Sequence, residues 1–192
     1  MTALNQAIAY LTLNTQPPPA ETVVAELLAA EKSAKSTQVT YAELCGTWRL
    51  GFVTGTQKTR QRAGIALGAG RFLPRWLVIT ITYEAAESAR LAESDRAQVQ
   101  NRVQCGPLVL TVSGPTCFWP QQRILAFDFT RMTVRLSQLT LYSGFIRQGQ
   151  RREAEFEQRS LKTQAFFKYF LVRSDCIAAR GRGGGLALWV AE

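Results

Sequence analysis

The sequence predicts a mainly β domain, an antiparallel β-barrel of about eight strands preceded by short helices. The apolar periodicity changes from helical to alternating near residue 40, and short alternating runs then recur almost to the end of the chain. The 10 Phe, 5 Tyr and 4 Trp also favour β structure, because large rings suit the inner face of a sheet or a ligand cavity.

The first part of the chain indicates two short helices separated by the prolines at positions 17–19. Apolar residues recur there at helical spacing in two groups: Leu4, Ile8 and Leu11, and then Val24, Leu27 and Leu28. We expect residues 1–36 to form a helical appendage whose contacts with the core are secondary. Residues 41–192 then form the barrel.

Strand-like alternation begins at Gly46, where Trp48, Leu50 and Phe52 share one face. Similar runs follow at Trp76–Tyr83, Pro107–Val112, Ile124–Phe129, Met132–Leu136, Leu139–Phe145, Phe166–Val172 and Leu186–Val190. Closure into a barrel is favoured because it removes exposed strand edges, and an open α+β sheet packed on the helices is the alternative. The polar stretch Glu84–Arg102 is expected to be a loop or short helix, and Arg147–Ser160 a surface loop.

Composition limits the chemistry and indicates partners. The formal charge of +9 favours an anionic lipid surface or nucleic acid as a partner. The chain has no His, which removes the commonest proton shuttle and zinc ligand. Its four cysteines are scattered and are expected to be reduced and mostly buried: Cys45, Cys105, Cys117 and Cys176. We therefore predict no catalytic residues, no metal site and no cofactor.

The sequence begins without a signal-peptide pattern, and no apolar run approaches the roughly 18 residues that a membrane span requires. These features predict a cytoplasmic protein that is soluble or peripheral to a membrane.

Three stretches carry a resemblance to a known family. The first is Leu44-Cys45-Gly46-Thr47-Trp48-Arg49-Leu50 with the run Thr54–Thr59, the second is Asn101-Arg102-Val103 leading to Gly106-Pro107-Leu108 and Phe127-Asp128-Phe129, and the third is Phe166–Phe170 with Ala178–Trp189. Together they resemble the plastid-lipid-associated protein, or fibrillin, family of plants and cyanobacteria. The resemblance implies a lipocalin-like barrel, association with thylakoids or lipid globules, and handling of quinones, carotenoids or other prenyl lipids. Because the plant members carry a transit peptide and this chain starts close to the domain, the resemblance favours a cyanobacterial type.

An eight-stranded barrel is just wide enough to be filled by side chains or to hold one small ligand. We expect a non-catalytic protein that binds an apolar molecule or lipid inside the barrel, through Leu50, Phe52, Ile79, Ile81, Leu110, Phe127, Phe129, Phe167 and Tyr169. The alternative is a filled barrel that acts as a structural or adaptor protein, coating lipid or binding a prenyl-lipid enzyme. A bilin-handling lyase ranks third, because the three stretches do not resemble that group.

Gly46 and Trp48 look like the first-strand signature of lipocalins, in which the Trp closes one end of the barrel under an Arg from the last strand. Arg180 and Arg182 are the candidates for that Arg, and a stack of this kind is worth about 0.5–2 kcal/mol. The glycine-rich stretch Gly181–Gly185 is predicted to be a bulge that lets the final strand bend.

A basic segment has no acid between Glu43 and Glu84, and its cations alternate with apolar residues. The cations are Lys58, Arg60, Arg62, Arg71 and Arg75. Such a segment suits docking on an anionic membrane surface. A solvated loop with carboxylates from elsewhere is the alternative, and we expect no nucleic-acid partner.

Overall fold

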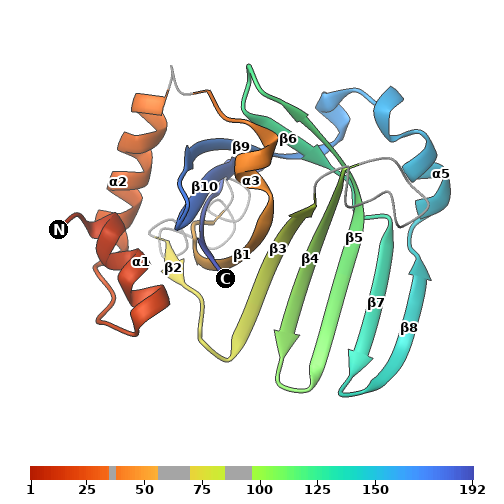
Figure 1. The fold of residues 1–192 in the computed structure, drawn as a ribbon, viewed down its shortest axis with the longest axis horizontal. Coiled ribbons are helices and arrows are strands. Elements are labelled where there is room, and N and C mark those ends of the chain that lie inside the picture. Colours follow the sequence, from red (N-terminus) through yellow and green to blue (C-terminus); the bar gives the residue numbers. More distant parts are fainter. Residues whose placement is uncertain (35–37, 56–69, 85–96) are drawn as a thin grey trace.

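The computed structural model describes residues 1–34, 38–55, 70–84 and 97–192 (Figure 1). Its helices are α1 (Ala3–Leu13), α2 (Ala20–Ser33), α3 (Tyr41–Leu44) and α5 (Gly149–Ala154), with the 3-10 turns η4 (Phe156–Gln158) and η5 (Leu161–Thr163). Its strands are β1 (Gly46–Val53), β2 (Arg71–Phe72), β3 (Leu77–Glu84), β4 (Gln98–Cys105), β5 (Leu108–Trp119), β6 (Ile124–Phe127), β7 (Arg131–Leu136), β8 (Leu139–Phe145), β9 (Ala165–Val172), β10 (Cys176–Gly181) and β11 (Leu186–Ala191).

Eight antiparallel strands close into a barrel in the order β1, β3, β4, β5, β6, β9, β10, β11 and back to β1. This confirms the predicted fold class, and the open α+β sheet is wrong. The long strand β5 pairs with β7 along Leu108–Ser113 and then with β6 along Thr116–Trp119. The hairpin β7–β8 therefore continues the wall of the barrel outside the closed ring.

Two members of the ring were not among the predicted strands. Strand β4 lies partly in the stretch expected to be a loop or short helix, and β10 has small residues in place of a clear alternation. Conversely, the predicted runs that became β7 and β8 form the side hairpin. The Gly181–Gly185 stretch is a tight turn between β10 and β11, with Gly181 N donating to Gly185 O at 2.9 Å, and not a bulge.

The helices α1 and α2 cover the outer face of β1, β11, β10 and β9 (Figure 1). A buried cluster joins Leu4, Ile8 and Leu27 from the helices to Phe52 and Leu188 from the barrel. Arg180 of β10 also donates to Glu31 of α2 at 2.6 Å, which lowers the pKa of that carboxyl. The helices thus share a core with the barrel and their contacts are more extensive than the sequence indicates. No helix in the described part of the chain is long and apolar enough to cross a bilayer.

A β-bulge in β1 decides which core receives Phe52. The register of β1 with β11 shifts between Leu50 and Phe52. Because side chains alternate between faces, the inserted residue reverses the alternation after it. Leu50 packs against the inner cluster, whereas Phe52 is fully buried under the helices against the ring of Phe72. The expectation that Phe52 lines the interior is therefore wrong.

Candidate functional site

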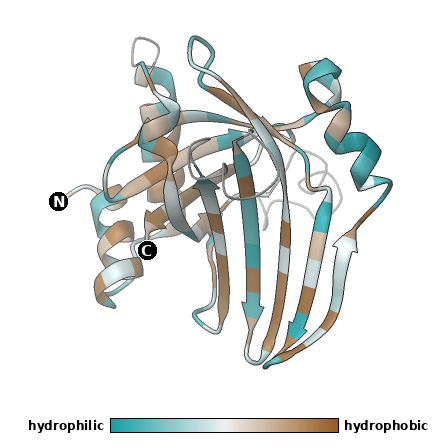
Figure 2. Ribbon diagram, turned by 45° about the vertical axis from the view of Figure 1, so that its right-hand side comes forward, coloured by the Kyte–Doolittle hydropathy of each residue, from teal (hydrophilic) through white to brown (hydrophobic). Residues whose placement is uncertain are grey.

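Two apolar rows cross the strands on the inner face of the wall formed by β3, β4, β5, β7 and β8, and the third row holds Asn101 between Ile81 and Val112. The row nearest the turns is Leu77, Cys105, Leu108, Leu136 and Leu139, and the next is Ile79, Val103, Leu110, Val134 and Tyr142. The outer face carries polar rows instead, such as Thr80, Arg102, Thr111, Thr133 and Ser143. Figure 2 shows this alternation of apolar and polar residues along the strands.

Burial along this inner face falls from one end of the barrel to the other. Near the closed end Ile81, Tyr83 and Val99 are at most 1% exposed. At the turns, Leu108 is 43% and Leu139 64% exposed. One half of the interior is therefore a packed core, and the other half is an open apolar surface.

Eight of the nine predicted interior residues lie on the inner face, and Phe52 is the exception. Ile81, Phe127 and Tyr169 are buried in the inner cluster, and Leu50, Phe129 and Phe167 pack against it partly buried. Ile79 and Leu110 lie one row nearer to the open end and are half-buried. The sequence thus selects the correct face, while most of these residues belong to its packed half.

A pair of tyrosines lies deep in the packed half. The hydroxyls of Tyr83 and Tyr169 are 2.6 Å apart, and both side chains are fully buried. Burial raises the pKa of both phenols well above their usual value, so both stay protonated. One hydroxyl hydrogen bond therefore satisfies two polar groups inside an apolar cluster.

Trp48 lies in the inner cluster, in the packed half of the interior. It is 5% exposed, and its indole Nε1 donates to Leu44 O at 2.8 Å beside α3. Gly46 begins the strand with φ +128, a conformation that favours glycine.

The predicted stack of an arginine on Trp48 is not formed. Arg180 pairs with Glu31 on the outer side, and Arg182 donates to the backbone carbonyls of Gln164 and Lys162. Within the described residues, the cation–π contacts are Arg75 with Tyr10 and Arg131 with Phe145. Arg180 instead links β10 to α2, and Arg182 links the turn after β10 to the segment that precedes β9.

A cleft of about 710 Å³ opens where β5 changes partner from β7 to β6. Its apolar side includes Val112, Met132 and the rings of Phe127, Phe129 and Phe167. The ring centroids of Phe127 lie 5.2 Å from Phe129 and 5.0 Å from Phe167. The cleft therefore continues the inner face at the end that is farther from the Leu108 and Leu136 turns.

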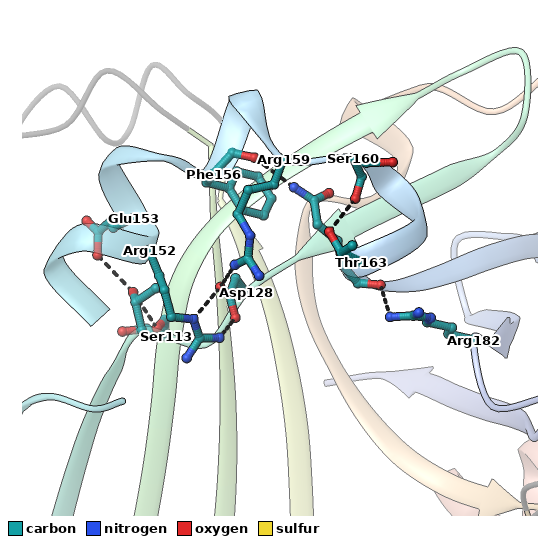
Figure 3. A network of polar contacts seen from close by, with 11 residues as sticks. Ser113, Asp128, Arg152, Glu153, Phe156, Arg159, Ser160, Thr163 and Arg182 are labelled. Carbon is teal, nitrogen blue, oxygen red and sulfur yellow. Dashed lines mark hydrogen bonds and ion pairs between the residues drawn. The ribbon is translucent and has the colours of Figure 1, made fainter. Parts of the chain in front are cut away.

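The polar side of the cleft is built by the insert between β8 and β9. Arg152 and Arg159 converge on Asp128, with Arg159 Nη1 3.1 Å from Oδ2 and Arg152 Nε 3.0 Å from the same oxygen (Figure 3). The side chain of Asp128 is only 12% exposed. The insert, expected to be a surface loop, is thus a short helical cap that Asp128 holds against the barrel.

Gly114 permits the close approach on which this cleft depends. A side chain at this position would collide with the backbone oxygen of Asp128 and crowd Thr130. The segment that leaves β6 for β7 can therefore cross β5 only beside a glycine.

The predicted membrane-docking segment is described in part. Lys58, Arg60 and Arg62 lie outside the described residues. Arg71 and Arg75 are exposed on and after β2. Trp76 is 67% exposed beside them.

The cysteines form no disulfide, and only Cys176 is buried. Burial raises the pKa of the Cys176 thiol to about 12, so it is a poor nucleophile at neutral pH. Cys105 is exposed, in contrast to the expectation of mostly buried thiols.

Comparison of the sequence with family models gave no match, and comparison with curated proteins gave none either. The resemblance to the plastid-lipid-associated family therefore depends on the three stretches quoted above.

Proposed function

We propose that this protein is a non-catalytic barrel that binds one apolar molecule along the inner face of β3, β4, β5, β7 and β8. The observation that carries the proposal is that the two inner rows nearest the turns are apolar but remain open, with Leu108, Leu136 and Leu139 43–64% exposed. Contiguous exposed apolar surface marks a site of interaction. A β-barrel fold is compatible with such a ligand.

The family resemblance indicates the class of ligand. A prenyl lipid, a quinone or a carotenoid has an elongated apolar body, which suits a face that extends across five strands. The resemblance also favours a location peripheral to a photosynthetic membrane or at lipid globules. Organic extraction of the purified protein followed by mass spectrometry would identify a bound molecule. A protein that carries none and binds no apolar probe would favour the filled-barrel adaptor.

Two adjacent residues of β5 provide a matched test of the binding face. Leu110 lies on the inner face and Thr111 on the outer face. A carboxylate at the inner position would have to be desolvated on contact with an apolar ligand. We expect Leu110→Asp to weaken binding of the neutral fluorescent probe N-phenyl-1-naphthylamine by at least about tenfold, and Thr111→Asp to leave it unchanged. Equal effects of the two substitutions would contradict the proposed face.

The open end of the barrel is also suited to contact an anionic membrane. The turns at the lower edge of Figure 1 bring Trp76, Leu108, Leu136 and Leu139 to one end, and Arg71 and Arg75 lie near Trp76 in the sequence. Large apolar side chains insert at the interface, and each cation near the surface adds about 1 kcal/mol. Phe72, by contrast, packs on Phe52 and Tyr10 and is not free to insert.

Sedimentation with vesicles that contain anionic lipid tests this contact. We expect Trp76→Glu and Leu139→Glu each to lower the affinity at least about tenfold, since withdrawing a large apolar side chain from the interface costs about 1.5–3 kcal/mol. Leu28→Glu is the control, because Leu28 is 45% exposed on α2, away from these turns. Loss of binding in the control alone would place the membrane contact elsewhere.

A further inference from the structure

The cleft beside α5 has an excess of positive charge. Among the residues that the structure describes, its lining includes Arg147, Arg152, Arg159 and Arg182 but one carboxylate, that of Asp128. Arg152 and Arg159 share this carboxylate, which can neutralise only one of their two charges. Their side chains are 27% and 33% exposed, so the remaining charge is only partly solvated.

The other two arginines add charge, and neither forms an ion pair with another described residue. Arg182 donates to two backbone carbonyls, which are neutral acceptors. Arg147 is exposed at the mouth of the cleft and makes no ion pair with any residue that the structure describes. The cleft therefore attracts an anion from solution.

A buried amide at the same wall has an unused acceptor. Gln164 is 4% exposed, and its Nε2 donates to Phe156 O at 2.7 Å. Its Oε1 is buried and has no partner among the described residues. A buried acceptor without a donor is uncommon in folded proteins. The polar wall thus offers several arginine donors to a compact head group.

The apolar wall of the cleft leads directly onto the proposed binding face. Val112 and Met132 are paired on the inner face and line the cleft. From Val112 to Leu108 the strand advances four residues, roughly 13 Å, to the exposed row at the turns. A molecule with a polar end in the cleft can therefore lay its apolar part on this face.

We propose that the arginine-lined cleft binds the anionic head group, a phosphate or carboxylate, of an amphiphile whose apolar part lies on the inner face. The inference rests on the proposed function, since it assigns the polar end of the same ligand. Guanidinium groups suit this task because they bind the oxygens of a phosphate or carboxylate with paired hydrogen bonds.

Three ligands with the same alkyl chain and different head groups test the proposal on the protein of residues 1–192: dodecyl phosphate, dodecanoate and dodecanol. Displacement of N-phenyl-1-naphthylamine gives their relative affinities. We expect at least one anionic ligand to bind about tenfold or more tightly than dodecanol, because a guanidinium group forms stronger hydrogen bonds with a charged acceptor than with a neutral hydroxyl. Preference for phosphate or for carboxylate identifies the head group, and either supports the proposal.

Variants locate the preference. The double substitution Arg147→Gln and Arg182→Gln should lower the affinity for the anionic ligand, relative to that for dodecanol, by about tenfold. The affinity for dodecanol itself should stay unchanged. Arg147→Gln alone, at an exposed residue, should lower this relative affinity to a smaller extent and keeps the test usable if the double variant does not fold. Arg151→Gln is the control, since Arg151 points to Glu155 on the exposed side of α5.

The remaining outcomes separate this proposal from the proposed function. Equal affinities for all three ligands would overturn the head-group site and leave the apolar site intact. Failure of all three to bind would overturn both. Displacement of dodecyl phosphate by an equal concentration of inorganic phosphate would show a free-anion site and overturn the amphiphile.

Discussion

Replacement of Trp48 by alanine is expected to lower the free energy of unfolding by about 3–5 kcal/mol. The indole is 5% exposed, lies in the inner cluster with Leu44 and Ile81, and donates a hydrogen bond to Leu44 O. Removing it leaves a cavity in the inner cluster and a buried carbonyl without its donor. Chemical denaturation followed by tryptophan fluorescence or circular dichroism measures the loss.

Two comparisons make this result specific. Trp48→Phe keeps an aromatic ring but loses the donor, so we expect a smaller loss of stability. Arg180→Ala should combine additively with Trp48→Ala, because Arg180 pairs with Glu31 of α2 and not with the indole. Strong coupling in this double-mutant cycle would support the stack of an arginine on Trp48 that the sequence predicts. An unchanged denaturation midpoint for Trp48→Ala would contradict the burial of Trp48 in the inner cluster.

The sequence was sufficient for the fold class because many short runs with apolar residues at alternate positions follow one another along the chain. It failed where that alternation is weak. In β4 the outward residues are Gln98, Gln100, Arg102 and Gln104, so the stretch reads as a polar loop, although Val99 and Val103 point inward. The bulge at Leu50 and Phe52 is likewise invisible in the sequence, because it depends on the register with β11.

The cleft was harder to predict because its parts are distant in sequence. Asp128 is 24 residues from Arg152 and 31 from Arg159, and each alone resembles a solvated surface charge. A signal was present in the density of arginines in the insert and in Asp128 between Phe127 and Phe129. Only the fold shows that these two stretches meet.

Deletion of residues 1–34 is expected to abolish the folded state of the barrel. The helices α1 and α2 bury Phe52, Leu186 and Leu188, each at most 2% exposed, on the outer face. Burying one such side chain contributes about 1.5–3 kcal/mol. The deletion also removes the burial of Ile8 and Leu27, which belong to the same cluster. Together these losses approach the 5–15 kcal/mol that stabilises a typical domain.

Circular dichroism and size-exclusion chromatography of the truncated chain measure the outcome, and we expect aggregation or loss of a cooperative melting transition. A pair of point variants tests the same packing between the helices and the barrel without removing any residue. Leu27→Ala should cost about 2–5 kcal/mol because Leu27 is fully buried between α2 and the barrel, whereas Leu28→Ala, at a residue 45% exposed, should cost little. A monomeric truncated chain that melts cooperatively with β-type circular dichroism would instead show that residues 41–192 fold alone, as the change of periodicity near residue 40 predicts. The helices would then be an appendage whose packing stabilises a barrel that does not require it.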